Sequence, residues 1–270
     1  MARYKLTIEY AGTRYSGWQI QKNARTVQGE LERAVREVVP RGHMESYGAG
    51  RTDAGVHALG QVAHLDLANE LPPSTLLARV NDALPHDITV IAVERVPARF
   101  HARHSAVARS YVYQIALRRT AFAKPFVWWV REPLDVDAMR DAADRFVGMS
   151  DFRAFTDDDP EEKSTKVLVE HVGLTQHDAM LVLRVVGSHF LWKMVRRLTG
   201  VLVEVGRGGL KPSDIAPLLS ASSGAAAKLT APPSGLFLEH VCYEPAPAVW
   251  PTTPPLFRLG RGPGGPEGRR

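Results

Sequence analysis

The stretch Gly50-Arg51-Thr52-Asp53-Ala54-Gly55-Val56-His57-Ala58 decides how this chain is interpreted. It places one carboxylate, Asp53, among small residues and beside an arginine. Glycines on both sides let the backbone take positive φ values and approach a ligand closely. A lone Arg-Thr-Asp-Ala sequence would favour an aspartate that caps a helix. The whole stretch, taken with the motifs that accompany it, instead predicts a reactive loop.

Further motifs occur along the chain in a fixed order. They are Tyr15-Ser16-Gly17-Trp18-Gln19-Ile20-Gln21, Thr26-Val27-Gln28, Asn81-Asp82-Ala83-Leu84-Pro85, Phe100-His101-Ala102-Arg103-His104-Ser105-Ala106, Arg109-Ser110-Tyr111-Val112-Tyr113, Phe190-Leu191 with Met194-Val195-Arg196, and Gly235-Leu236-Phe237-Leu238. With the Asp53 stretch they resemble the tRNA pseudouridine synthase A family over residues 3–243. One such motif can arise by chance, but the whole ordered series cannot plausibly do so.

Composition sets limits on the class of protein. The 270 residues are 44% hydrophobic, enough for a sizeable core in one domain or two. The net charge of +5 and the pI of about 9.4 are compatible with a polyanionic partner. The single cysteine, Cys242, excludes an intrachain disulfide and is expected to be a small buried residue.

Hydropathy along the chain bears on location. The first ten residues are too charged for a signal peptide, and no segment approaches the roughly 20 apolar residues of a membrane span. We therefore expect a cytoplasmic protein with no membrane partner.

Periodicity predicts interleaved helices and strands, which indicates an α+β fold. Strands are expected at residues 4–10, 61–67, 88–96, 109–117, 167–176 and 179–186, and helices at 26–38, 73–84, 135–146 and 189–206. The acidic residues 157–163 and the Pro-, Gly- and Arg-rich residues 244–270 look solvated, and most of the latter are expected to be disordered.

The resemblance implies a domain organisation. Members have two similar halves with mainly antiparallel sheets, joined into one extended sheet with a central active-site cleft. The expected boundaries are 1–106 for the half with the Asp53 loop, 107–243 for the second half, and 244–270 for the tail. Members are also homodimers, a state that the composition does not show.

The resemblance implies an isomerase that converts uridine to pseudouridine in the anticodon stem-loop of tRNAs, at positions 38, 39 and 40. The reaction breaks the bond from N1 of the base to C1′ of the ribose and joins C5 to C1′. It needs neither a metal nor a redox cofactor, and the sequence has no metal-binding or dinucleotide motif. Asp53 matches the catalytic aspartate; an ester at C1′, addition to the base and a glycal route all remain open.

Substrate-binding residues also follow from the resemblance. Tyr111 matches a tyrosine that stacks on the flipped uracil and can transfer a proton, whereas Tyr113 is expected to be structural. Arg196 or Arg51 is expected to offset the desolvation of Asp53. Arg51 could instead hold a phosphate or brace the partner of the target base. Leu236 could pack against the base, although a leucine in a strand is usually core.

A basic run from Arg95 to Arg119 contains no acid and suggests contact with RNA phosphates. The chain departs from the family at Lys166, His189, Trp192 and Lys193, which bears on substrate contacts and not on the reaction. Three other functions remain as alternatives. They are a non-catalytic RNA-binding protein, a metal-dependent hydrolase using His101 and His104, and the same reaction on another RNA.

Overall fold

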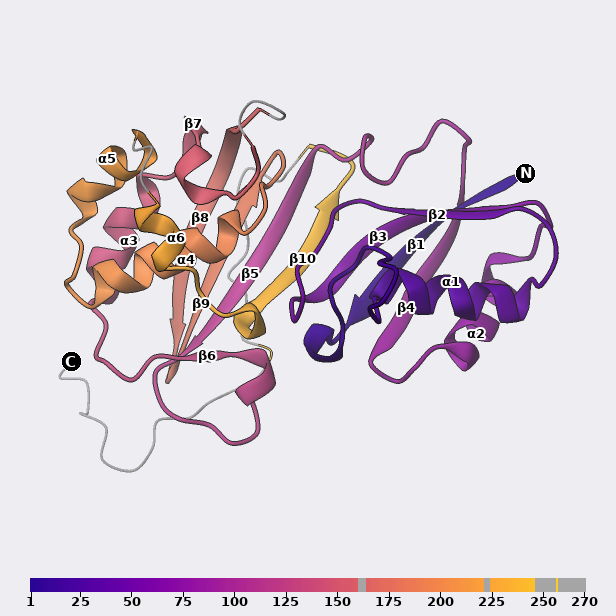
Figure 1. Ribbon diagram of the computed structural model, residues 1–270, viewed down its shortest axis with the longest axis horizontal. Coiled ribbons are helices and arrows are strands. Elements are labelled where there is room, and N and C mark those ends of the chain that lie inside the picture. The colour runs from indigo at the N-terminus through magenta and orange to yellow at the C-terminus, as the bar shows by residue number, and fades with distance from the viewer. Residues whose placement is uncertain (160–163, 221–223, 246–255, 257–270) are drawn as a thin grey trace. The chain divides into compact units, whose positions relative to one another are not determined.

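The computed structural model describes residues 1–159, 164–220, 224–245 and 256 (Figure 1). The chain divides into two compact units. Unit 1 combines Met1–Tyr111 with the segment that starts at Phe237, and unit 2 contains Val112–Leu236. The last strand of the chain thus belongs with the N-terminal residues, whereas the predicted boundaries assign it to the second half. Most of the predicted tail lies outside the described residues.

Unit 1 is built on strands whose side chains alternate between faces. In β1, Tyr4, Leu6 and Ile8 are fully buried, while the residues between them are partly exposed. The strand order is β4-β1-β3-β10, with β2 paired to β3. Neighbours are antiparallel except β10, which runs parallel to β3 at Phe237 and Leu238. The bounds are β1 Ala2–Tyr10, β2 Met44–Gly48, β3 His57–Leu67, β4 Ile88–Val96 and β10 Leu236–Cys242.

Two helices pack together in unit 1, α1 Val27–Val38 and α2 Pro73–Ala83 (Figure 1). Thr26 caps α1, because its side chain accepts a hydrogen bond from the Gly29 N–H at 3.2 Å. The apolar stripe of α1 is buried at Val27, Leu31, Ala34 and Val35. The predicted positions of both helices are confirmed to within one residue.

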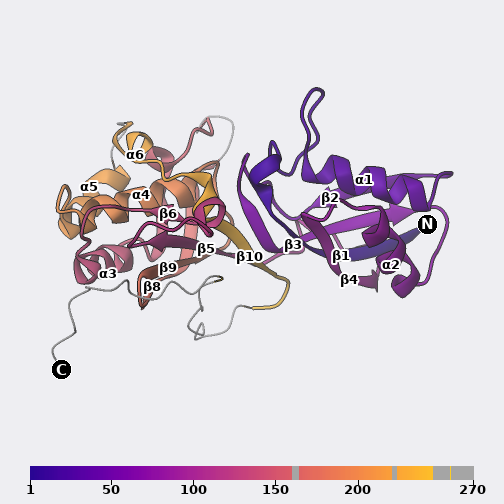
Figure 2. The same cartoon turned by 90° about the horizontal axis from the view of Figure 1, so that it is seen from below.

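Unit 2 has the strand order β5-β9-β8-β7, with the short β6 parallel to β5. Helices α3 and α4 lie side by side against its strands (Figures 1 and 2). The strands are β5 Ala108–Ala116, β6 Trp128–Trp129, β7 Gly148–Asp151, β8 Lys166–His177 and β9 Met180–Gly187. The helices are α3 Val136–Asp144, α4 Met194–Gly206, α5 Ile215–Ser220 and α6 Ala225–Lys228. The first residues of β5 belong to unit 1. Short 3₁₀ turns lie at Gly12–Arg14, Lys124–Phe126, Arg153–Phe155, Pro212–Asp214 and Pro233–Gly235.

The predicted start of the long helix at His189 is wrong, since α4 begins at Met194. Lys193 has a φ of +62°, a left-handed conformation that an α-helix does not contain. Phe190 and Leu191 fit the helical spacing, but they precede the helix. The rest of the predicted stripe, from Met194 to Val205, is buried.

Asp157, at the start of the acidic residues 157–163, is exposed as predicted, but the first two aspartates are engaged by neighbouring groups. The Asp157 carboxylate pairs with Lys193 at 2.7 Å and with Arg197. Asp158 accepts a hydrogen bond from the Trp192 N–H at 2.9 Å. Residues 160–163 lie outside the described part of the chain.

The predicted fold class is confirmed. The described residues form an α+β structure whose ten strands are mainly antiparallel. Cys242 ends β10 and is buried, as predicted. Within the described ranges, no helix combines the length and the apolar character needed to cross a membrane.

The buried His64 of β3 should make stability depend on acid pH. Its Nδ1 accepts a hydrogen bond from the Ala102 N–H at 3.1 Å, and burial, with the charge of Arg3, lowers its pKa from 6.5 to about 4. Below pH 6.5 the His64 imidazole binds a proton in the unfolded chain, whereas in the folded chain it binds one only below about pH 4. We expect the free energy of unfolding to fall by about 3 kcal/mol over this window. Urea unfolding at several pH values measures it, and His64→Gln should flatten the curve. An unchanged slope in that variant would contradict the assignment.

Candidate active site

The loop around Asp53 is held by the backbone of the segment 15–18. The Trp18 N–H donates to the Thr52 carbonyl at 3.1 Å, and the Gly55 N–H donates to the Tyr15 carbonyl at 3.2 Å. Within the loop, the Val56 N–H donates to the Asp53 carbonyl at 3.1 Å. The main chain is therefore fixed on both sides of the half-buried Asp53.

Glycines make this close approach possible. Gly17 has a φ of +92°, and a Cβ on it would lie 2.4 Å from the Thr52 carbonyl oxygen. A Cβ on Gly12 would lie 1.9 Å from the Val56 carbonyl oxygen. Of the two glycines in the Asp53 stretch, Gly55 has the predicted positive φ, at +78°. Gly50 does not, and a Cβ there would meet no atom within 4 Å.

Side chains fix the two ends of the loop. The Thr52 hydroxyl is hydrogen-bonded to the Tyr10 hydroxyl at 2.8 Å, in the core of unit 1. His57, fully buried, accepts the Gly12 N–H on Nδ1 at 2.9 Å and stacks on Phe237 with ring centroids 4.6 Å apart. His57 is also the first residue of β3, so the stretch from Gly50 to Ala58 leads directly into that strand.

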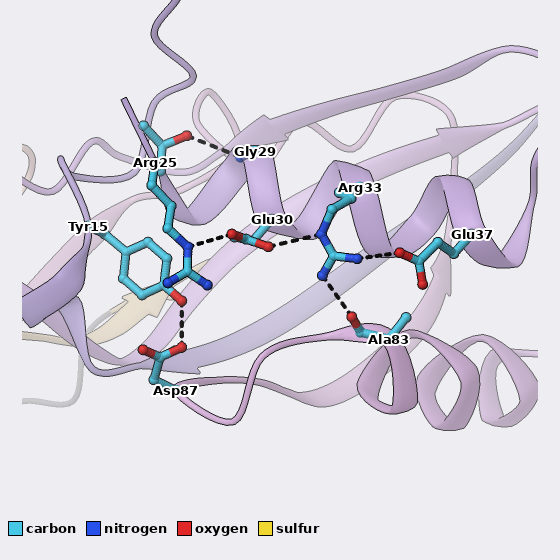
Figure 3. A network of polar contacts seen from close by, with 9 residues as sticks. Tyr15, Arg25, Gly29, Glu30, Arg33, Glu37, Ala83 and Asp87 are labelled. Carbon is cyan, nitrogen blue, oxygen red and sulfur yellow. Dashed lines mark hydrogen bonds and ion pairs between the residues drawn. The ribbon is translucent and has the colours of Figure 1, made fainter. Parts of the chain in front are cut away.

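A polar network orders the segment that holds the loop (Figure 3). The Tyr15 hydroxyl donates to Asp87 at 2.5 Å, and burial together with this bond raises the pKa of Tyr15. The Arg25 guanidinium lies 5.0 Å from the centre of the Tyr15 ring and pairs with Glu30 at 2.6 Å. Arg33 extends the network by pairing with Glu30 at 3.0 Å (Figure 3). Tyr15, whose carbonyl accepts the hydrogen bond from Gly55 of the loop, is thus fixed in place through its side chain.

Tyr111 of β5 lies within the electrostatic reach of Asp53. The tyrosine is 9% exposed, and burial raises its pKa to about 12, with a further contribution from the negative charge of Asp53. The positive charge of Arg109 acts in the opposite direction. The negative charge of Asp53 therefore acts on the hydroxyl of Tyr111, the tyrosine that the sequence singled out. The Tyr111 hydroxyl keeps its proton at neutral pH.

Arg109 has a role that the sequence analysis missed. Its guanidinium donates to the carbonyls of Arg103 at 2.7 Å, Ala106 at 3.2 Å and Ala49 at 3.2 Å. It ties the turn before β5 to the residue that precedes the Asp53 stretch, and burial lowers its pKa. No local sequence signal separates Arg109 from the other arginines of the basic run, because its partners are carbonyl groups.

The basic run is thus only in part a candidate for phosphate contact. Arg95 pairs with Glu70, and Arg109 is turned towards backbone carbonyls. The inference that the run lacks a counter-charge is therefore wrong, because Glu70 lies outside the segment in sequence. Arg103 is exposed.

The other predicted site residues occupy different environments. Arg51 is exposed on the Asp53 loop, in unit 1. Arg196, in the first turn of α4, is half-buried and donates through Nε to the Ala231 carbonyl at 2.8 Å. Leu236 is 5% exposed at the start of β10.

His101 and His104, the two histidines considered for a metal site, contact neighbouring backbone and rings. His101 Nδ1 accepts from the N–H groups of Arg103 at 3.1 Å and His104 at 3.3 Å. Its ring packs against those of His64 and His104, with centroids 4.6 and 4.3 Å away. Among the residues with described positions, no group of three or more histidine, cysteine or acidic side chains could hold a metal ion.

Asp53 and the glycine-supported loop that carries it lie in a part of the chain that matches a known family, whereas Tyr111 lies between the two matched segments. The model of the tRNA pseudouridine synthase family matches residues 6–105 and 142–244. The chain belongs to the tRNA pseudouridine synthase family. The predicted family is therefore confirmed, and the enzyme class of this family is that of an isomerase.

Similar proteins span nearly the whole chain. Two from Rhodopseudomonas palustris, strains BisA53 and BisB18, each named tRNA pseudouridine synthase A, are 44% identical to it. Each match covers 90% of this chain and 100% of the relative. A protein of the same name from Exiguobacterium sp. is 39% identical over 90% of this chain and 99% of its own length.

Substitution of Gly17 tests the contact that holds the Asp53 loop. Gly17→Ala puts a methyl group 2.4 Å from the Thr52 carbonyl oxygen at a positive φ, so the loop must shift. We expect the free energy of unfolding to fall by about 1–3 kcal/mol. We also expect the pseudouridine-forming rate to fall by at least about tenfold, since small displacements of reacting groups are costly.

Gly50→Ala is the matched control, in the same loop, with open space around the added methyl. It should leave the free energy of unfolding unchanged, as measured by urea titration. Equal stability of the two variants would show that the Gly17 contact is not a constraint.

Proposed function

We propose that this chain is an isomerase that converts uridine to pseudouridine in the anticodon stem-loop of tRNA, at positions 38, 39 and 40. Membership of the tRNA pseudouridine synthase family and the names of the relatives support the reaction and the tRNA substrate. The observation that carries the proposal is the placement of Asp53 on a fixed loop within electrostatic reach of the buried Tyr111. A cytoplasmic location and a homodimer form part of the proposal and rest on the resemblance to the family.

The reaction is balanced without a cofactor. The N1–C1′ bond breaks, the base turns, and C5 bonds to C1′. The proton on C5 leaves, and N1 takes up a proton, so atoms and electrons are conserved. What the protein must supply is a negative group at the sugar and base, a surface for the rotated ring, and a route for one proton.

Asp53 is the group that we assign to the sugar and base. A carboxylate can attack C1′ to form an ester, as carboxylates of retaining glycosidases do at sugar carbons, or can add to the base. Its fixed main chain limits the entropy lost when the reacting atoms are brought together. Either route requires that the target uridine first leave its helical stack.

The remaining residues have proposed roles around the flipped base. Tyr111 stacks on the uracil and, because its pKa of about 12 keeps the hydroxyl protonated, donates or relays a proton through it. Arg196 stabilises the charge on Asp53, and Arg51 fills the space that the base vacates. Leu236 packs against the ring.

The central prediction concerns Asp53. Asp53→Asn keeps the shape of the side chain and removes its charge and nucleophilicity, so it should abolish pseudouridine formation. We would map pseudouridine by carbodiimide modification and primer extension on unmodified tRNA transcripts. The exposed Asp141 of α3 supplies the control, and Asp141→Asn should behave as the wild type.

The pattern of primer-extension stops has distinct meanings. Stops in the anticodon stem with the wild type alone support both the substrate and the residue. Stops at other positions would support the same reaction on a different part of the RNA. Near-normal turnover by Asp53→Asn contradicts the mechanism, and RNA binding without any stops favours a non-catalytic binding protein.

A second prediction separates stacking from proton transfer at Tyr111. Tyr111→Phe keeps the ring, so the affinity for tRNA should change by less than about twofold. Loss of the hydroxyl should slow the single-turnover rate by about 10²-fold or more, a typical contribution of general acid–base catalysis.

Tyr113→Phe is the matched control, two residues along the same strand. Its hydroxyl donates to the Pro232 carbonyl at 2.7 Å, so this variant should lose stability and keep its rate. A full rate in Tyr111→Phe would restrict Tyr111 to stacking.

A further inference from the structure

Two acidic side chains of unit 2 occupy the start of α4. The Asp157 carboxylate lies 2.7 Å from Lys193 Nζ and also contacts the Arg197 guanidinium. Asp158 Oδ2 accepts the Trp192 N–H at 2.9 Å. We use the name α4 entrance for Lys193, Arg197 and the backbone from Trp192 to the first turn of α4. At the α4 entrance, one carboxylate thus contacts two cations and a second accepts a backbone N–H.

The fit of Asp157 to Arg197 is incomplete. The side chain of Arg197 is 4% exposed, and its Nε is buried without a hydrogen-bond partner. Asp157 meets the guanidinium through another nitrogen, Nη2. A buried donor without a partner is rare and costly in folded proteins. The geometry of a guanidinium favours an anion that accepts from two of its nitrogens at once, as phosphate does.

The α4 entrance has the electrostatics of an anion site. The first turn of α4 contains no acidic residue, and the amino end of a helix carries partial positive charge. Lys193 and Arg197 add two full charges. Hydrogen bonds from Lys193 and then Arg197 lower the pKa of Asp157, so this carboxylate is ionised at neutral pH and competes for the same cations as a phosphate would.

Trp192 extends the site on its solvent side. Half of this side chain is exposed, and Lys193 Nζ lies 4.5 Å from the centre of its ring. Exposed aromatic rings beside cations are the usual platforms for bases next to bound phosphates. A nucleotide unit therefore finds both a cationic contact and a stacking surface at the α4 entrance.

We propose that the α4 entrance binds a phosphate of the RNA backbone, and that Asp157 and Asp158 occupy this site in the free protein. This inference rests on the proposed function, because the ligand is a phosphate of the tRNA substrate. RNA displaces the two carboxylates, and the phosphate oxygens accept from Lys193 and from both Nε and Nη2 of Arg197. The acidic pair thus lowers the affinity for RNA and opposes non-specific binding.

The test compares two double variants that remove the same charge. Asp157→Asn with Asp158→Asn weakens the competitor, whereas Asp137→Asn with Asp141→Asn neutralises exposed residues of α3. We would measure the affinity for an unmodified tRNA transcript at several NaCl concentrations. The first double variant should bind about fivefold more tightly than the control at 0.15 M salt. Adding Lys193→Gln to it should remove this gain.

A single variant tests the same site without touching the acidic pair. Lys193→Gln in the otherwise unchanged protein should weaken tRNA binding and reduce the slope of log affinity against log salt by about 1. Thermal unfolding of each variant verifies that it folds. If the Asp157 and Asp158 double variant does not fold, Lys193→Gln alone still tests the site.

Each outcome decides the inference. Binding by the first double variant equal to that of the control overturns it, and weaker binding than the wild type shows that the acids themselves support the RNA contact. Pseudouridine formation by the wild type is measured on the same transcript. If the wild type forms none, the proposed function fails. If it forms pseudouridine while Lys193→Gln binds normally, the inference about the α4 entrance alone fails.

Discussion

The close contact between Gly17 and the backbone at Thr52 is the constraint on which the candidate site depends. The two chain segments approach so closely that a single methyl group on Gly17 would lie 2.4 Å from a carbonyl oxygen. Main-chain hydrogen bonds from Trp18 and to Tyr15 flank this point. The loop that carries the Asp53 carboxylate is thereby fixed through its main chain.

This rigidity suits the chemistry. Rearrangement of a glycosidic bond demands that a carboxylate meet one carbon or one face of a base, and preorganised groups lose little entropy when they react. The loop continues directly into β3 at His57, while Tyr111 comes from β5 and Arg109 ties the two regions through carbonyl groups. The side chains proposed for the site therefore lie on a strand of the sheet or on a loop that leads directly into one.

Sequence reasoning succeeded where the determining contacts are local. Alternation predicted β1, and Thr26 with its apolar stripe predicted α1, because these signals depend on neighbours within a few residues. The start of α4 was missed because Phe190 and Leu191 satisfy the helical period although Lys193 interrupts the helix. Asp53 and Tyr111 were proposed as site residues through the family resemblance, since composition and spacing alone would have left Asp53 as a capping residue.

Contacts between segments distant in sequence account for the features that the sequence did not predict. Arg109 bonds to Ala49, Arg95 pairs with Glu70, and Asp157 pairs with Arg197. Each of these partners lies outside the stretch in which the charge was interpreted, so the run of arginines looked unpaired and the run of aspartates looked solvated. Gly17 belongs to the same class, because only the folded chain reveals that its missing side chain makes room for Thr52.

The loss of the hydrogen on C5 of the target uridine is the most direct measure of the central claim, that the Asp53 loop rearranges a uridine. A tRNA transcript labelled with tritium at C5 of its uridines releases tritium to water when C5 bonds to C1′. The account predicts release with the wild type, at most one tritium for each modified position, and none with Asp53→Ala. Equal release with both proteins, or none with the wild type on any tRNA, would contradict it.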